Sequence, residues 1–180
     1  MMQDVQPTRL TAYVPKEYFY DASRTLQQDT DGARDRLREF MDWLRSVPDD
    51  ALHRAVAPGK WSPAEYADHV ARANWLFARR LREHRPGEPL EDVGFGAMFP
   101  DGRVIAHAGT EPMPGRDREA LLSDLQDSAR ALEDAVNAYL LEGRLDEPCM
   151  PHQYFGPLTA RETMRLAMTH YERHLSQLRP

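Results

Sequence analysis

Residues 62–83 read SPAEYADHVARANWLFARRLRE, and this stretch has a clear helix start. Ser62 and Glu65 form a capping box with Pro63 at the first helical position. The serine hydroxyl can accept a hydrogen bond from the amide of Glu65, and the glutamate can accept one from the amide of Ser62. Apolar residues then recur at steps of three and four, which places them on one helix face. The stretch therefore predicts an amphipathic helix that ends at about Glu83.

Three further segments have the same periodicity. Residues 21–47 carry an apolar stripe, but Gly32 costs about 1 kcal/mol relative to alanine, so the first turns are expected as a separate short piece. Residues 117–142 form the next segment, with Gly143 placed for a left-handed C-terminal cap. The last segment opens with a second capping box at residues 159–162 and continues almost to the last residue. No segment has the pattern of a strong strand.

Four amphipathic helices predict an all-α four-helix bundle. The connection from His84 to the third helix has about thirty residues, far more than an antiparallel turn needs. Such a long crossover can run back along the bundle and leave the second and third helices parallel. The chain then divides into an N-terminal extension, residues 1–20, and a bundle domain, residues 21–180.

Composition narrows the classes of function. The chain has 180 residues, a net charge of −6, and scattered rather than clustered lysines and arginines, which disfavours a nucleic-acid partner. No run approaches the ~20 apolar residues of a membrane span, and the N-terminus lacks a signal peptide, so a cytoplasmic location is expected. The single cysteine, Cys149, cannot form an internal disulfide and is predicted to be a structural or exposed thiol rather than a nucleophile.

Two histidines on the last predicted helix are candidate metal ligands. His170 and His174 are four residues apart, which places them on one helix face with Cβ atoms about 6 Å apart. Two imidazoles can meet one metal ion at this spacing, although a solvated face gives the same pattern. Both lie beside the apolar stripe, where an unpartnered polar group is costly. His69, on the inner face of the second helix, is either a core histidine or a third ligand, provided that the two helices are antiparallel.

Other residues near these histidines are given no catalytic role. Glu172 lies two residues after His170, roughly 200° around the helix, so it is predicted to point away and is not the base of an HExxH protease motif. Trp61 is expected to anchor its loop against the bundle. His53 and His84 are predicted to lie near helix ends, beside solvent. His107 and His152 are predicted to lie in loops, outside any pocket.

Two blocks of sequence resemble a known family. Residues 58–70, PGKWSPAEYADHV, resemble the "gkWS…E…H" segment of DinB-like proteins, the DinB/YfiT superfamily. Residues 155–162, FGPLTARE, followed by His170 and residues 174–178, HLSQL, resemble its "FG.lt..E…H…H..Q" ending. The blocks have the order and spacing of the family, and the resemblance covers about Asp21 to the C-terminus. It implies a four-helix bundle with a long crossover between the second and third helices.

The resemblance also implies a metal site. The family's metal ligands correspond to His69, His170 and His174. These residues would hold one divalent ion, with zinc or nickel expected and iron as a further candidate. Gln177, one turn beyond His174, is predicted to orient a ligand or a bound water.

The resemblance implies only a class of chemistry. Characterised relatives are thiol-dependent transferases and isomerases, which use mycothiol or bacillithiol, and hydrolase-like enzymes. The sequence therefore predicts a metal-dependent enzyme acting on a small-molecule substrate, either by hydrolysis or by transfer with a low-molecular-weight thiol cosubstrate. The alternatives are a non-catalytic, stress-related metal-binding or interaction module and a purely structural bundle. A homodimer is expected by family analogy.

Overall fold

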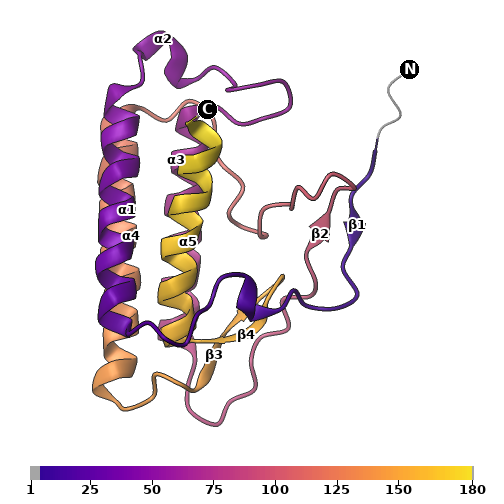
Figure 1. Cartoon of the computed structure of the whole chain (residues 1–180), viewed down its shortest axis with the longest axis vertical. Helices are drawn as coiled ribbons and strands as arrows, with labels where there is room; N and C mark the ends of the chain where they lie inside the picture. The colour runs from indigo at the N-terminus through magenta and orange to yellow at the C-terminus, as the bar shows by residue number, and fades with distance from the viewer. Residues whose placement is uncertain (1–4, 180) are drawn as a thin grey trace.

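Four long helices dominate the computed structural model, which describes residues 5–179 (Figure 1). They are α1 (Leu26–Ser46), α3 (Pro63–Glu83), α4 (Arg118–Leu141) and α5 (Ala160–Leu178). In Figure 1, α1 and α5 run in one direction and α3 and α4 run in the other. The predicted four-helix bundle is thus confirmed, with α3 and α4 parallel across the long crossover and α3 and α5 antiparallel. Among the described residues, no helix is long and apolar enough to cross a bilayer.

Side-chain caps fix where the helices begin. Ser62 and Thr159 form the predicted capping boxes of α3 and α5, and Asp117 caps α4. The start of α1 differs from the prediction: Thr25 and Gln28 form a third capping box, so this helix begins at Leu26. The sequence prediction placed the start of this segment at about residue 21, upstream of the cap.

Gly32 lies inside a continuous helix, so the expected break in the first segment is wrong. A Cβ atom at this position would overlap Sδ of Met168 on α5. Glycine therefore allows α1 and α5 to pack closely, and that packing offsets its weak helix propensity.

The core lies between the four helices and includes a small buried polar cluster. The Tyr171 hydroxyl donates to Asn74 Oδ1 at 3.0 Å, and the Asn74 amide nitrogen donates to the hydroxyl of Ser128. Tyr139 donates to the carbonyl oxygen of Leu81 at 2.7 Å. Because α3 positions 74 and 81 meet α4 positions 128 and 139 in the same order, these contacts agree with parallel helices.

Two short antiparallel strand pairs accompany the helices, although no segment of the sequence has the pattern of a strong strand. Strands β3 (Pro148–His152) and β4 (Gly156–Thr159) form a hairpin that leads into α5. Their three prolines resemble loop sequence, but each strand of a two-stranded hairpin has an unpaired edge that accepts proline. The second pair joins β1 (Thr8–Arg9) to β2 (Ala97–Met98) in the crossover.

Residues 5–20 tie the crossover to the hairpin. β1 pairs with β2, and the amide of Val14 donates to the carbonyl oxygen of Tyr154 at 2.7 Å. In the short 3-10 helix η1 (Lys16–Tyr18), the ammonium group of Lys16 pairs with Glu162 at 3.1 Å. The short helix α2 (Asp49–Leu52) lies at the opposite end of the bundle (Figure 1). The N-terminal segment therefore closes one side of the cavity described below.

Candidate metal centre

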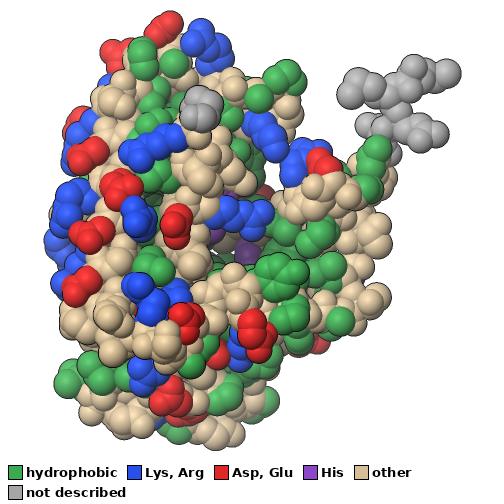
Figure 2. Space-filling model, viewed as in Figure 1, with side chains coloured by type: hydrophobic (Ala, Val, Ile, Leu, Met, Phe, Trp, Pro, Cys, Tyr) green, Lys and Arg blue, Asp and Glu red, His purple; other side chains and the backbone are tan. Residues whose placement is uncertain are grey.

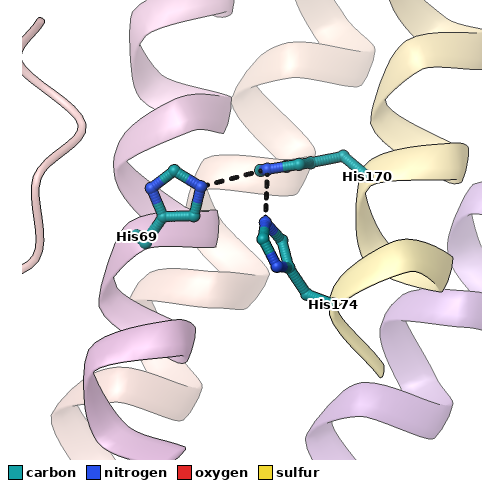
Figure 3. Close-up of side chains that lie close together, drawn as sticks. All are labelled: His69, His170 and His174. Atoms are coloured by element: carbon teal, nitrogen blue, oxygen red, sulfur yellow. Dashed lines mark hydrogen bonds between the residues drawn. The ribbon is translucent and has the colours of Figure 1, made fainter. Parts of the chain in front are cut away.

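Three histidines from two helices converge on one point (Figure 3). His69 comes from the second turn of α3, and His170 and His174 come from consecutive turns of α5. Nε2 of His170 lies 3.1 Å from Nε2 of His69 and 2.9 Å from Nε2 of His174. Each residue offers one ring nitrogen, and these three atoms lie within 4.8 Å of one another. The three rings come together because α3 and α5 are antiparallel, as the sequence predicted.

Hydrogen bonds to the outer nitrogens set the orientation of two rings. Nδ1 of His69 lies 2.8 Å from the carbonyl oxygen of Thr110, and Nδ1 of His174 lies 2.8 Å from Oε1 of Gln177. Both acceptors place the ring proton on Nδ1, so both Nε2 lone pairs face His170. Nε2 of His170 carries at most one proton, so it can donate a hydrogen bond to only one of these two nitrogens. A cation would satisfy the whole set, and a ligating histidine with its other N–H on a carbonyl is typical of metal sites.

Burial keeps these rings uncharged. It lowers the pKa of His69, with the hydrogen bond to Thr110 opposing the effect in part, and it lowers the pKa of His174 to about 3. The pKa of His170 also falls well below its ordinary value because the ring is buried and next to two other histidines. Neutral imidazole is the form that binds a metal, so the three rings can act as ligands at neutral pH without losing protons.

Asp68 fixes the crossover beside His69. Its carboxylate is fully buried and accepts hydrogen bonds from the amide of Met113 at 2.7 Å, from Arg116 at 2.6 Å and from Arg72 at 2.7 Å. Burial alone would raise the pKa of this carboxyl group, but the three donors together lower it. Because Met113 and Arg116 lie three and six residues after Thr110, this anchor also holds the carbonyl group that orients His69.

A pocket of about 440 Å³ opens beside the three histidines. Figure 2 shows the hollow between the helices and the crossover, with histidine atoms visible inside it. Its walls come from the N-terminal segment, α3, the crossover, the hairpin and α5. They are mainly apolar and include Phe19, Trp61, Phe77, Met98, Ile105, Phe155 and Leu166.

Two histidines predicted to lie outside any pocket line this one. Nε2 of His107, in the crossover, is 2.9 Å from Nε2 of His152 in β3. Nδ1 of His152 accepts hydrogen bonds from the backbone amides of Tyr154 and Phe155 at 3.1 and 3.2 Å. The proton of the His152 ring is therefore on Nε2, which donates to Nε2 of His107. Burial lowers the pKa of His107 to about 3 and that of His152 well below its ordinary value. The sequence carried no signal for this pair because only the tertiary fold brings the two segments together.

The structure settles several other predicted positions. Glu172 and His53 are exposed, as expected. The expected solvent neighbourhood of His84 is wrong, because its ring is largely buried and pairs with Glu147 at 3.3 Å. Trp61 packs on Tyr66 and His69 with ring centroids 5.3 and 4.8 Å away, and it also lines the pocket, so its role goes beyond anchoring a loop.

Comparison with known proteins places the fold. A parallel α3–α4 pair with a long crossover, and three histidines shared between α3 and α5, define a distinct class of helical bundle. The chain belongs to the DinB superfamily, whose family model matches residues 30–178. It is similar to the uncharacterized protein YuaE of Bacillus subtilis (strain 168), with 24% identity over 145 residues that cover 78% of this chain and 89% of that protein.

A solved structure has the same fold. The mycothiol-dependent maleylpyruvate isomerase superposes with a TM-score of 0.64 at 14% identity. The match covers 92% of this chain and 63% of the isomerase, so this chain spans less than two thirds of that protein's length. At this identity the likeness shows a shared fold.

Proposed function

We propose that this protein is a metal-dependent enzyme that joins a low-molecular-weight thiol to a small, largely apolar substrate or hydrolyses such a substrate. The observation that carries the proposal is the set of three neutral imidazoles whose Nε2 atoms converge at the wall of a pocket. Thiol transfer is placed before hydrolysis because the structural neighbour is described as mycothiol-dependent.

His69, His170 and His174 would hold one zinc or nickel ion, with iron as the third choice. Three imidazoles leave coordination positions open, where the ion would act as a Lewis acid and lower the pKa of a thiol or of water. The chain's own residues do the positioning. Thr110 and Gln177 hold two rings by their Nδ1 atoms, and the aromatic wall excludes water and receives the apolar part of a substrate.

The alternative is a non-catalytic metal-binding or interaction module on the same scaffold. In such a protein the metal would be fully coordinated and inert. The pocket favours the enzyme, because it gives a small molecule direct access to the histidine rings that line it.

Metal content is the first test. Untagged protein, analysed by elemental mass spectrometry, is expected to hold close to one zinc, nickel or iron per chain. The His170→Ala, His174→Ala double variant is expected to lose it, whereas His53→Gln, at an exposed position, should retain it. Wild-type protein that takes up no metal after incubation with zinc or nickel followed by dialysis would rule out the metalloenzyme.

Mass spectrometry of small molecules then separates the two reactions. Metal-loaded protein is incubated with an electrophile such as 1-chloro-2,4-dinitrobenzene and with mycothiol, bacillithiol or glutathione, and in parallel with ester substrates. A thiol adduct formed faster than with the double variant supports transfer, and ester cleavage without thiol supports hydrolysis. Metal-loaded protein that is inert with every thiol and ester supports the non-catalytic module.

A further inference from the structure

The pocket has one charged side chain in its wall. Five histidines line it, and the remaining lining residues, with one exception, are apolar or uncharged polar groups. The exception is Arg173 on α5, between His170 and His174 in sequence. Among the residues that line the pocket, Arg173 therefore carries the one permanent charge.

Arg173 differs from the two arginines beside Asp68. Arg72 and Arg116 both pair with the buried carboxylate of Asp68. Within residues 5–179, in contrast, no carboxylate lies within ion-pair distance of Arg173, and its guanidinium donates no hydrogen bond to the protein. Its five N–H groups are available to a ligand.

The charge of Arg173 acts on the cavity rather than only on solvent. It contributes to lowering the pKa values of His69, His170 and His174, and it acts in the same direction on the pKa of Tyr154 across the pocket. A guanidinium group binds a carboxylate or sulfonate through two parallel hydrogen bonds, a geometry that ammonium groups lack. An apolar cavity with one such group selects amphiphiles with a single anionic end.

We propose that the pocket binds small organic anions, with an apolar body against the aromatic wall and one carboxylate or sulfonate group on Arg173, and that Arg173 determines this preference. That such a ligand is also the substrate rests on the proposed function. The binding preference itself does not require a metal ion.

Two fluorescent probes with the same aromatic skeleton test the preference. 1-Anilinonaphthalene-8-sulfonate is anionic, and N-phenyl-1-naphthylamine lacks the sulfonate. Each is titrated into full-length protein, as purified and after metal removal with EDTA. Arg173→Gln removes the charge, Arg173→Lys keeps the charge without the paired donors, and Arg130→Gln removes an exposed arginine on α4 that does not line the pocket.

Arg173→Gln is expected to weaken sulfonate binding about three- to tenfold, a modest loss because Arg173 is exposed to solvent as well as lining the pocket, and to leave binding of the neutral probe within about twofold of wild type. The affinity of Arg173→Lys for the sulfonate probe should lie between those of wild type and Arg173→Gln. Arg130→Gln should bind both probes with wild-type affinity. High salt should weaken sulfonate binding to the wild type more than to Arg173→Gln.

Three outcomes would overturn the proposal: no binding of the anionic probe to wild type, equal losses of both probes in Arg173→Gln, or the same loss in Arg130→Gln. The decisive titrations use metal-free protein, so they stand even if the protein proves to hold no metal. Conversely, a protein that binds zinc but shows no anion preference would contradict this inference alone.

Discussion

Oε1 of Gln177 lies 2.8 Å from Nδ1 of His174, one turn earlier on α5. Removing this acceptor frees the ring to rotate and weakens it as a ligand. We expect Gln177→Ala to weaken zinc binding about tenfold, the low end of the range for such supporting residues because the side chain is exposed. Competition with a fluorescent zinc chelator measures the affinity. Ser176→Ala is the matched control, since the serine hydroxyl donates only to the backbone of Arg173. Equal affinities of both variants would show that Gln177 plays no part in the site.

Asp68 accepts three hydrogen bonds that an asparagine cannot all replace. We expect Asp68→Asn to lower the free energy of unfolding by about 2–3 kcal/mol. This loss is smaller than the full cost of breaking a buried ion pair, because the side chains of Arg72 and Arg116 are partly exposed. Urea denaturation followed by circular dichroism measures it. Asp42→Asn, in an exposed pair with Arg45, should change stability by less than about 0.5 kcal/mol. A similar small change in Asp68→Asn would refute the anchoring role.

Gly96 is buried where the N-terminal segment, the crossover and the hairpin meet. A Cβ atom there would overlap the ring of Tyr154, whose hydroxyl donates to the carbonyl oxygen of Ala97 at 2.9 Å. The ring cannot move without losing that bond, so Gly96→Ala should destabilise the protein by about 1–3 kcal/mol. Thermal unfolding checks this value. Gly87→Ala serves as the comparison: a Cβ atom there meets no neighbouring atom, and the positive φ of this residue adds only backbone strain. A smaller loss of stability in Gly96→Ala than in Gly87→Ala would contradict the packing argument.

His107 and His152 make stability depend on pH. Both have pKa values lowered by burial, to about 3 for His107, whereas unfolded histidine titrates near 6.5. Below pH 6.5 the unfolded chain therefore binds protons that the folded protein does not. The free energy of unfolding should fall with decreasing pH by up to about 1.4 kcal/mol per pH unit for each histidine.

Urea denaturation between pH 7 and 5 measures this slope. The His107→Gln, His152→Gln double variant should have a shallower slope, and His53→Gln, at an exposed position, should keep the wild-type slope. A double variant with an unchanged slope would show that the pair titrates in the folded protein as it does in the unfolded chain.

Cys149 is fully buried in β3, and burial raises the pKa of its thiol to about 11. A thiol that is protonated and inaccessible reacts slowly. In native protein at pH 8 we expect almost no reaction with 5,5′-dithiobis(2-nitrobenzoate), and one equivalent of thiol in denaturant. Rapid labelling of native protein would place this cysteine at the surface.

The sequence predicted the features that depend on local patterns. The capping boxes at Ser62 and Thr159 set two helix starts, and the length of the crossover indicated the parallel α3–α4 pair. The convergence of His69 with His170 and His174 followed from these, since antiparallel helices bring one end of α3 to the far end of α5. Their placement was thus inferred without any contact being known.

The remaining site residues have no local pattern. His107 and His152 lie in irregular or proline-rich sequence, and only the folding of the crossover onto the hairpin joins them. The anchoring role of Asp68 was missed because its partners Met113 and Arg116 lie far along the chain. Arg173 was overlooked because a charged residue on a helix is usually solvated, and its lack of a carboxylate partner is visible only in three dimensions.

The contact between the N-terminal segment and the hairpin has a consequence for synthesis. Lys16 and Glu162 are 146 residues apart in the chain, and both Val14 and Phe155 line the pocket. On the ribosome, residues 5–20 emerge long before the hairpin and α5 exist. The nascent chain therefore presents Phe19 to solvent or to chaperones until its partner Phe155 has been made. The pocket therefore cannot assemble before α5 has been made, and a chain that stops before residue 170 contains only one of the three converging histidines.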